Sequence, residues 1–417
     1  MNVTLLSPVL RGEISAISSK SEAHRLLIAA ALSDRETHIV CPVKNDDIER
    51  TAECLSALGA RISYDGGIFA VTPISAPVLN GVLPVGESGS TLRFLVPVVA
   101  ALGCGATFLM RGRLPSRPMQ PLLAALEKGG VMAEQKGDAL TISGKLLPME
   151  YAVRADISSQ FISGLLFALP LVRGATLLLV GQAESTPYID MTKDTLQLFG
   201  VSVTQNGDTL SVGDATYQSP GNAVVGGDYS NAAFFLAAGA IGDCPVTVTG
   251  LSPETKQGDR AVLRLLSDFG ASVTEENGRV TVSRGSLRGI PVDARDIPDL
   301  VPILAVVASF AEGETVFTGI SRLRAKESDR VASVTAMLSA LGGDCTAEED
   351  TLTVRRARLT GGSVSSAGDH RIAMAAAIAA TAASGAVTVE GAEAVNKSYP
   401  HFFDDMKKIT VKGEIVC

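Results

Sequence analysis

The chain has 417 residues, of which 46% are hydrophobic and 5% aromatic, and its formal net charge is −8. A chain of this length and apolar content can bury at least two ordinary cores, so we expect two domains. The acidic balance argues against a nucleic-acid or anionic-membrane partner, because such partners favour a broad basic field. Six scattered cysteines without a C-x-x-C pair, and only four histidines, argue against a disulfide framework and a bound metal.

The start of the chain and two uncharged runs bear on location. Residues 1–16 lack the basic start, apolar core and cleavage site of a secretory signal, which predicts a cytoplasmic protein. The runs at 94–110 and 372–389 approach the length of a membrane span, but each is interrupted by glycine or serine. We therefore predict that each run folds as helix, turn and strand.

A segment of eighteen residues, "LSALGARISYDGGIFAVT" at 55–72, has similar copies along the whole chain. Each copy fits a helix that is stopped by glycine and followed by a β-hairpin. The five helix-ending glycines are predicted at Gly59, Gly130, Gly200, Gly270 and Gly343, so their spacings are 71, 70, 70 and 73 residues. Spacings this regular indicate a repeated structural unit.

A second repeated segment alternates with the first. It predicts an alanine-rich helix that leads through a short turn into a strand, as in "AALSDRETHIV" at 30–40. The predicted unit is helix, strand, helix and hairpin, in six copies that account for the entire length. The sixth copy lacks a full hairpin, so we expect the strand near the N-terminus to complete its sheet. This predicts a domain at 19–226 and a discontinuous domain of 1–18 plus 227–417, with hinges near 18 and 226 that close a cleft on a substrate.

Polar and basic residues cluster at the predicted helix starts, first in "SSKSEAHR" at 18–25. Serine and aspartate there are ordinary N-caps when taken singly. Lysine and arginine oppose the helix dipole at this end, whereas an anion is favoured there. The basic residues in register are Lys20, Arg25, Arg93, Arg117, Lys326, Arg330, Arg371 and Lys397. Together they predict a binding site for an anion of several charges.

The motifs "SKSEAHR", "GESGSTLR", "LPSRPMQPLL", "ISSQFISGLL", "LRAKESDR", "GDHRIAMA" and "NKSYPHFFDDM" occur in an order that resembles the EPSP synthase family, the 3-phosphoshikimate 1-carboxyvinyltransferases, over essentially the whole chain. The resemblance implies an α/β fold: a two-domain inverted α/β barrel with helices inside, built from six βαβαββ repeats of about 70 residues, three per domain. It also implies transfer of the enolpyruvyl group of phosphoenolpyruvate to the 5-hydroxyl of shikimate 3-phosphate, in the shikimate pathway. The implied enzyme needs no cofactor or metal, and we expect a monomer.

The resemblance further implies which residues form the site. For shikimate 3-phosphate these are Lys20, Ser21, Arg25, Ser158, Ser159, Gln160, Ser185, Asp299 and Lys326. For phosphoenolpyruvate they are Lys20, Gly89, Arg117, Gln160, Arg330, Arg371 and Lys397. The implied catalytic residues are Asp299 as base, Glu327 as proton donor to the methylene carbon, and Lys20 as a further acid or charge stabiliser.

Two positions qualify this expectation. Gly89 lacks a Cβ, which would let backbone N–H groups approach the ligand closely. Arg322 stands where some members of the family carry an asparagine, so its contact with substrate phosphate is left open. The division of roles between Asp299 and Glu327 is also left open.

Three alternatives remain at this point. The UDP-N-acetylglucosamine enolpyruvyl transferases share the fold and the donor, but their first motif begins Lys-Asn and their mobile loop carries a reactive cysteine. Here Ser21 follows Lys20, and residues 110–120 contain no cysteine. An RNA terminal phosphate cyclase is built from similar units, but an acidic chain with few aromatic residues is a poor platform for RNA. The third alternative is a non-catalytic relative that has kept the fold and binds anions but has lost turnover.

Overall fold

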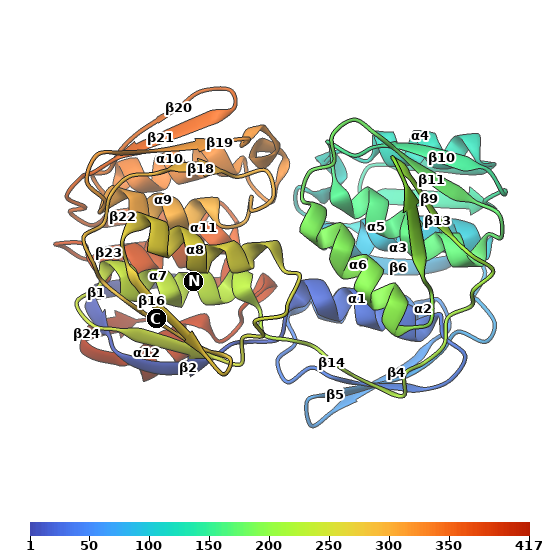
Figure 1. Cartoon of the computed structure of the whole chain (residues 1–417), viewed down its shortest axis with the longest axis horizontal. Coiled ribbons are helices and arrows are strands. Elements are labelled where there is room, and N and C mark those ends of the chain that lie inside the picture. Colours follow the sequence, from blue (N-terminus) through green and yellow to red (C-terminus); the bar gives the residue numbers. More distant parts are fainter. The chain divides into compact units, whose positions relative to one another are not determined.

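The computed structural model describes all 417 residues, and the chain divides into two compact units. Residues 18–225 form one of them, here called the inserted unit. Residues 1–17 and 226–417 form the other, here called the host unit. Figure 1 shows the helices and strands of each unit along the sequence.

The inserted unit contains three repeats. Its elements are α1 (Lys20–Ala31), β3 (Thr37–Val40), α2 (Asp46–Ala57), β4 (Arg61–Asp65), β5 (Ile68–Thr72), β6 (Gly81–Gly86), α3 (Gly89–Leu102), β7 (Ala106–Met110), η1 (Leu114–Ser116), α4 (Gln120–Lys128), β8 (Val131–Lys136), β9 (Ala139–Gly144), β10 (Glu150–Arg154), α5 (Ser159–Ala168), η2 (Leu169–Leu171), β11 (Thr176–Val180), α6 (Thr186–Leu198), β12 (Val203–Asn206), β13 (Thr209–Val212) and β14 (Asn222–Val224).

The host unit contains the other three. Its elements are β1 (Asn2–Leu10), β2 (Gly12–Ser15), α7 (Tyr229–Ile241), β15 (Val246–Thr249), η3 (Gly258–Arg260), α8 (Ala261–Phe269), β16 (Ser272–Glu276), β17 (Arg279–Ser283), β18 (Pro291–Asp293), α9 (Val301–Ser309), β19 (Glu314–Thr318), η4 (Ser321–Ala325), α10 (Arg330–Ala340), β20 (Asp344–Ala347), β21 (Thr351–Arg355), β22 (Gly362–Ser365), α11 (His370–Ala379), β23 (Val387–Glu390), η5 (Ala392–Lys397), α12 (Phe402–Lys408) and β24 (Thr410–Val416).

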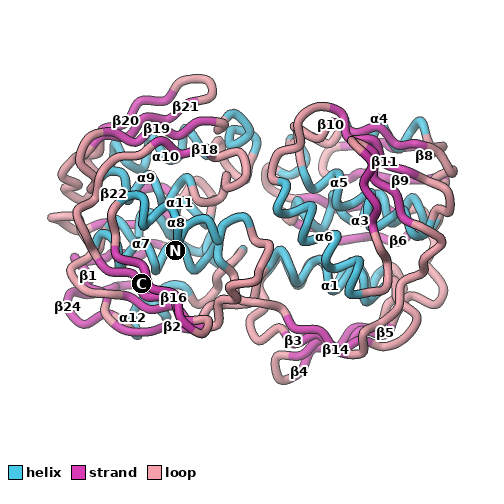
Figure 2. The backbone as a smooth tube through the Cα atoms, viewed as in Figure 1, coloured by secondary structure: helices cyan, strands magenta, loops and turns pink.

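The six repeats form six separate four-stranded sheets. The second repeat shows the plan: its strand order is β6-β7-β9-β8, with β6 parallel to β7 and the hairpin of β8 and β9 antiparallel. The helix between the first two strands of a repeat is the alanine-rich one, and it is almost wholly buried, as α3 and α11 show. Figure 2 shows the helices gathered inside each unit and the strands along its outside. The predicted repeat is confirmed, although the sheets do not close into a continuous barrel.

The N-terminal strand completes the last sheet, as predicted. Strand β1 lies between β23 and β24 and is antiparallel to both. Two further strand pairings were not predicted: β2 pairs in parallel with β15, and β14 pairs in parallel with β3. These strands of four and three residues are too short to show an alternating apolar pattern. Each supplies the first strand of its unit's first repeat.

The glycines that end the second helix of each repeat have left-handed backbone, as a helix stop requires. The φ angle is +112° at Gly59, +90° at Gly130, +78° at Gly200 and +102° at Gly270. In the fifth copy the left-handed residue is Gly342, with φ of +84°, and not Gly343. The prediction of Gly343 was therefore wrong by one residue, because two adjacent glycines give the same sequence signal.

Both long uncharged runs fold as predicted. Helix α3 ends at Gly103, whose φ is +67°, and β7 follows; helix α11 likewise leads to β23. No helix in the structure combines the length and the apolar character that a membrane crossing needs.

Candidate active site

The first turn of α1 contacts the first turn of α2. Ser19 caps α1, and Asn45 caps α2 by accepting a hydrogen bond from the backbone N–H of Ile48 at 3.1 Å. Lys20 Nζ lies 2.9 Å from Asp47 Oδ2, and both side chains are largely buried. The predicted catalytic lysine is therefore held at the N-terminal ends of two helices, where free backbone N–H groups favour an anion.

Arg25 is buried and its hydrogen-bond acceptors are neutral. Its Nε donates to Thr192 Oγ1 at 2.8 Å, its Nη2 to the carbonyl of Tyr188 at 2.8 Å, and its Nη1 to the carbonyl of Ser21 at 2.7 Å. The guanidinium also lies over the ring of Phe94, 5.1 Å from its centroid. Burial lowers the pKa of Arg25 to about 10. A buried cation held in this way favours an anionic ligand.

Gly89 begins α3 next to two guanidinium groups. A Cβ at this position would lie 2.7 Å from Arg93 Nη1 and 2.9 Å from Arg117 Nη1. Arg93 Nη1 donates to Gln160 Oε1 at 2.9 Å, and Gln160 Nε2 donates to Ser90 Oγ at 2.9 Å. A side chain here would push the ends of both arginines aside, so glycine favours their present positions, a reason that the sequence did not indicate.

Three predicted serines stand at the starts of α5 and α6. Ser158 caps α5 by accepting a hydrogen bond from the N–H of Gln160 at 3.3 Å, and Ser159 is the buried first residue of that helix. Ser185 precedes α6 with φ of +55° and ψ of +41°, in the left-handed region, and its side chain is buried. This conformation is unfavourable by about 1 kcal/mol or more for a residue with a Cβ, and such strain clusters at ligand sites.

In the host unit, Arg330 is 1% exposed and its guanidinium contacts three carboxylates. Its Nη1 lies 2.7 Å from Asp299 Oδ1, its Nη2 2.7 Å from Glu327 Oε2, and its Nε 2.9 Å from Asp369 Oδ2. Burial alone would lower the pKa of Arg330, but the three carboxylates raise it above its ordinary value. The arginine stays charged and brings both predicted acid–base residues to one place.

Asp299 contacts two further cations. Arg371 Nη2 lies 2.9 Å from Asp299 Oδ2, and Lys326 Nζ lies 3.7 Å from Oδ1. Burial alone would raise the pKa of Asp299, but Arg371, Lys326 and Arg330 hold it well below its ordinary value. Burial lowers the pKa of Lys326 to about 8, against the opposite effect of Asp299. Asp299 is therefore ionised, as a base must be.

Two other predicted positions lie at short 3₁₀ helices of the host unit. Lys397 is the last residue of η5 and is 9% exposed. Arg322 lies in η4 and donates to the carbonyl of Arg295 at 2.7 Å. The asparagine position of some relatives is thus occupied by an arginine that is tied to the chain's own backbone.

The predicted residues are divided between the two units. The inserted unit contains Lys20, Ser21, Arg25, Gly89, Arg117, Ser158, Ser159, Gln160 and Ser185. The host unit contains Asp299, Lys326, Glu327, Arg330, Arg371 and Lys397. Two carboxylates in these networks were given no role from the sequence: Asp47, which pairs with Lys20, and Asp369, which pairs with Arg330. Both stand at helix starts, so the register of the repeats was the available signal.

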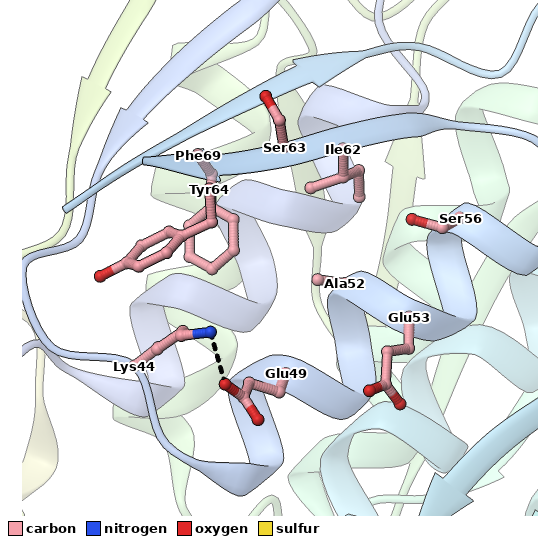
Figure 3. Close-up of a pocket in the computed structure, with 9 residues that line it drawn as sticks. All are labelled: Lys44, Glu49, Ala52, Glu53, Ser56, Ile62, Ser63, Tyr64 and Phe69. Carbon is pink, nitrogen blue, oxygen red and sulfur yellow. Dashed lines mark ion pairs between the residues drawn. The ribbon is translucent and has the colours of Figure 1, made fainter. Parts of the chain in front are cut away.

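A pocket of about 420 Å³ lies beside α2 and the β4–β5 hairpin (Figure 3). Its lining residues are Lys44, Glu49, Ala52, Glu53, Ser56, Ile62, Ser63, Tyr64 and Phe69. Lys44 Nζ is paired with Glu49 at 2.6 Å, which leaves the lining with a second carboxylate and no further cation. This pocket contains none of the predicted site residues, and its charge does not suit a polyanion.

Comparisons with known proteins agree with this fold. The model of the EPSP synthase (3-phosphoshikimate 1-carboxyvinyltransferase) family matches residues 7–406. The 3-phosphoshikimate 1-carboxyvinyltransferase of Clostridium kluyveri is 37% identical, over 97% of this chain and 96% of its own, and that of Methanococcoides burtonii is 38% identical, over 98% of each. The structure of EPSP synthase from Acinetobacter baumannii superposes with a TM-score of 0.82 at 25% identity, over the whole of both chains.

The repeats and the basic helix starts define a two-domain transferase of anionic small molecules. The chain belongs to the EPSP synthase family. The family, the enzyme class and the fold class that the sequence predicts are confirmed.

Proposed function

We propose that this chain transfers the enolpyruvyl group of phosphoenolpyruvate to the 5-hydroxyl of shikimate 3-phosphate and releases inorganic phosphate. One observation supports the proposal above the others. In each unit, buried or largely buried lysine and arginine side chains lie within the first two turns of a helix or just before it, where the dipole disfavours cations unless an anion is bound. Both substrates carry a phosphate and a carboxylate, which matches such a site in a protein of net charge −8.

The acceptor, shikimate 3-phosphate, is proposed to bind mainly to the inserted unit. Serine hydroxyls suit a phosphate that is held and not transferred, and the planar fork of Arg25 suits the shikimate carboxylate. The proposed residues are Lys20, Ser21, Arg25, Ser158, Ser159, Gln160 and Ser185, with Asp299 and Lys326 from the host unit.

The donor, phosphoenolpyruvate, is proposed to bind Lys20, Gly89, Arg117, Gln160, Arg330, Arg371 and Lys397. Arg330 has five N–H donors, and four of them are engaged by carboxylates. An anionic group of the donor therefore has to displace Asp299 or Glu327 in order to bind Arg330 fully. We propose that this exchange frees the displaced carboxylate for proton transfer.

The proposed chemistry is addition followed by elimination. Asp299 accepts the proton of the 5-hydroxyl, whose oxygen attacks C2 of phosphoenolpyruvate while Glu327 protonates the methylene carbon C3. Lys20 acts as a further acid or stabilises the charge of the resulting tetrahedral intermediate. In the elimination the C2–O bond to phosphate breaks, Glu327 takes a proton back from C3 to restore the double bond, and the proton held by Asp299 leaves with the phosphate. Each step uses side chains alone, in keeping with the proposal of no cofactor.

We also propose that the protein is a cytoplasmic monomer without nucleic-acid or membrane partners. The net charge of −8 supports the absence of such partners, because they favour a broad basic field. The junctions near residues 18 and 226 are proposed as hinges. A solution mass near that of one 43.2 kDa chain would support the monomer, and a mass of twice that value would contradict it.

The test is phosphate release from the purified protein. Phosphoenolpyruvate is supplied with shikimate 3-phosphate in one reaction, with UDP-N-acetylglucosamine in a second, and alone in a third. We expect release only in the first. Release only in the second would move the acceptor to the UDP-sugar, and no release in any of them would favour a binding protein without turnover.

A further inference from the structure

Asp369 is a buried carboxylate to which neither the sequence nor the proposed chemistry gives a role. It caps α11, and its side chain is 0% exposed. Its Oδ1 accepts a hydrogen bond from the backbone N–H of Arg371 at 3.0 Å. A capping carboxylate of this kind normally ends in solvent, because capping needs only one oxygen. Full burial of the charge therefore indicates further partners.

Those partners lie at the start of α10. Asp369 Oδ2 accepts hydrogen bonds from Arg330 Nε at 2.9 Å and from Ser328 Oγ at 3.1 Å. Oδ1 accepts a longer one from Arg330 Nη2 at 3.4 Å. One carboxylate thus joins the first turn of α11 to the residues on either side of Asp329, which caps α10.

These contacts fix the plane of the Arg330 guanidinium. With Nε held by Asp369, the two Nη groups point to Asp299 and Glu327, at 2.7 Å each. The guanidinium is planar and rigid, so its orientation at Nε determines where both Nη groups lie. Asp369 in this way sets the position of the two carboxylates that are proposed to transfer protons.

The backbone before Asp369 is held in an unfavourable conformation. Ala367 has φ of +52°, in the left-handed region that alanine rarely adopts, and Gly368 has φ of +69°. Ser366 Oγ stabilises this turn by accepting from the N–H of Gly368 at 3.2 Å and donating to the carbonyl of Gly391 at 2.9 Å. A turn that is strained and fixed on both sides presents Asp369 at one position, as is common at functional sites.

We propose that Asp369 is a positioning residue for the transfer reaction: it holds the Arg330 guanidinium and the first turn of α11 in the orientation that Asp299, Glu327 and Arg371 require. It acts through Arg330 and contacts no substrate. This inference rests on the proposed function for its kinetic consequence, but the contact between Asp369 and Arg330 can be measured independently.

The kinetic experiment compares two asparagine variants at neighbouring helix caps. Asp369→Asn keeps a good N-cap but loses the charge that faces Arg330 Nε. Asp329→Asn changes the cap of α10, whose carboxylate accepts from the N–H of Ala332 at 3.1 Å and is 41% exposed. We expect kcat/KM for phosphoenolpyruvate to fall about 30- to 100-fold in Asp369→Asn, the usual loss for charged hydrogen bonds. Asp329→Asn should remain within about twofold of the parent.

A second variant pair separates positioning from folding. Arg330→Lys removes the Nε that Asp369 holds, so the further change Asp369→Asn should cost less than about threefold in that background. Equal losses in both backgrounds would overturn the proposal, because Asp369 would then act independently of Arg330. If the circular dichroism spectrum shows that Asp369→Asn does not fold, the experiment uses Asp369→Ser instead, since serine caps a helix equally well and carries no charge.

The independent readout is the Nε–H resonance of Arg330 in protein labelled with 15N-arginine, assigned by its absence in Arg330→Lys. We expect this proton to exchange slowly with water in the parent and at least about tenfold faster in Asp369→Asn, because the charged acceptor is gone. Slow exchange in both proteins would contradict the contact itself. If the parent releases no phosphate but shows this difference, the proposed function fails and the positioning contact stands.

Discussion

Arg25 in the inserted unit and Arg330 in the host unit are both buried, with 3% and 1% of their surface exposed, but they are held by different groups. Hydroxyls and carbonyls surround Arg25, whereas three carboxylates surround Arg330. The pKa shifts follow this difference: burial lowers the pKa of Arg25 to about 10, and the carboxylates raise that of Arg330 despite its burial.

The comparison distinguishes two ways to prepare a site for an anion. The positive charge of Arg25 is not cancelled by the groups that orient it, because its acceptors are neutral, so an anion that binds there competes with no carboxylate of the protein. The charge of Arg330 is already balanced, so an anion binds by exchange with a carboxylate of the protein. We infer that the inserted unit offers a preformed anion site and the host unit a site that its own acid–base residues occupy.

The largest effect is expected at Asp299, which the exchange is proposed to release. Replacing Asp299 by alanine should lower kcat about 1000-fold, within the usual range for a general base, and change the dissociation constant of shikimate 3-phosphate far less. Stopped phosphate-release assays and calorimetry measure the two quantities. Asp293→Ala serves as the control, because Asp293 pairs only with Arg295 on the surface. Turnover retained in Asp299→Ala would refute the assignment of Asp299 as base.

Truncating the two arginines should separate the two kinds of site. Arg330→Met leaves three carboxylates near one another without their shared cation, which we expect to cost about 3 kcal/mol, or about 100-fold faster amide exchange in α10 and α11. Arg25→Met leaves carbonyls that keep their helical hydrogen bonds, so exchange in α1 should rise less than about tenfold. Hydrogen exchange followed by mass spectrometry measures both. Equal losses would contradict the comparison.

A second network of neutral groups in the inserted unit, around His24, predicts that stability depends on pH. His24 is fully buried; its Nδ1 lies 2.6 Å from Thr51 Oγ1, Thr51 Oγ1 lies 2.6 Å from Thr91 Oγ1, and Ser88 continues this chain. Burial lowers the pKa of His24 to about 3, from 6.5 when unfolded. The unfolded chain therefore takes up the proton first, and stability is lost as pH falls from 6.5 towards 3.

At pH 5 this loss should be about 2 kcal/mol relative to pH 7.5. His24→Asn should remove that part of the pH dependence, as judged by amide exchange in α1 at the two pH values. His401→Asn, at an exposed histidine, is the matched control and should leave it unchanged. An unaltered pH dependence in His24→Asn would show that His24 is not the group responsible.

The smallest effect is expected at Lys326, which of the three cations around Asp299 is the least tightly paired, at 3.7 Å. Its pKa of about 8 means that the ammonium loses its proton as pH rises from 7 to 9. Binding of shikimate 3-phosphate should therefore weaken about tenfold over this range, as measured by calorimetry. Lys326→Arg should bind almost independently of pH in this range, and a similar slope in both proteins would exclude Lys326 as a ligand of the phosphate.

Much of the fold could be predicted because the repeat contains residues with strong local conformational preferences. The buried alanine-rich helix gives the same signal six times and the glycine helix stop five times, so single ambiguities matter little. The signal failed where it was locally ambiguous, as at Gly342 and Gly343, or where a strand was too short to show a pattern, as in β2 and β14.

The candidate site was predicted less completely, for a physical reason. Basic residues at helix starts are unusual and therefore visible in a sequence, but aspartate at a helix start is the commonest cap. Asp47 in the first turn of α2 and Asp369 at the cap of α11 look like ordinary helix-start residues until the structure shows Lys20 and Arg330 beside them. Which carboxylate neutralises which cation depends on contacts between different repeats, such as the 39 residues that separate Asp369 from Arg330, and not on local spacing.

The position of β1 also has a consequence for synthesis of the chain. Its Thr4 pairs with Thr388, 384 residues later, whereas β14 closes the inserted unit by residue 224. At roughly 5 to 20 residues per second, the ribosome needs about 20 to 80 s to supply the partner of β1 after making it. During that time the apolar strand has an unpaired edge, so a segment made long before its partners is among the last to be protected.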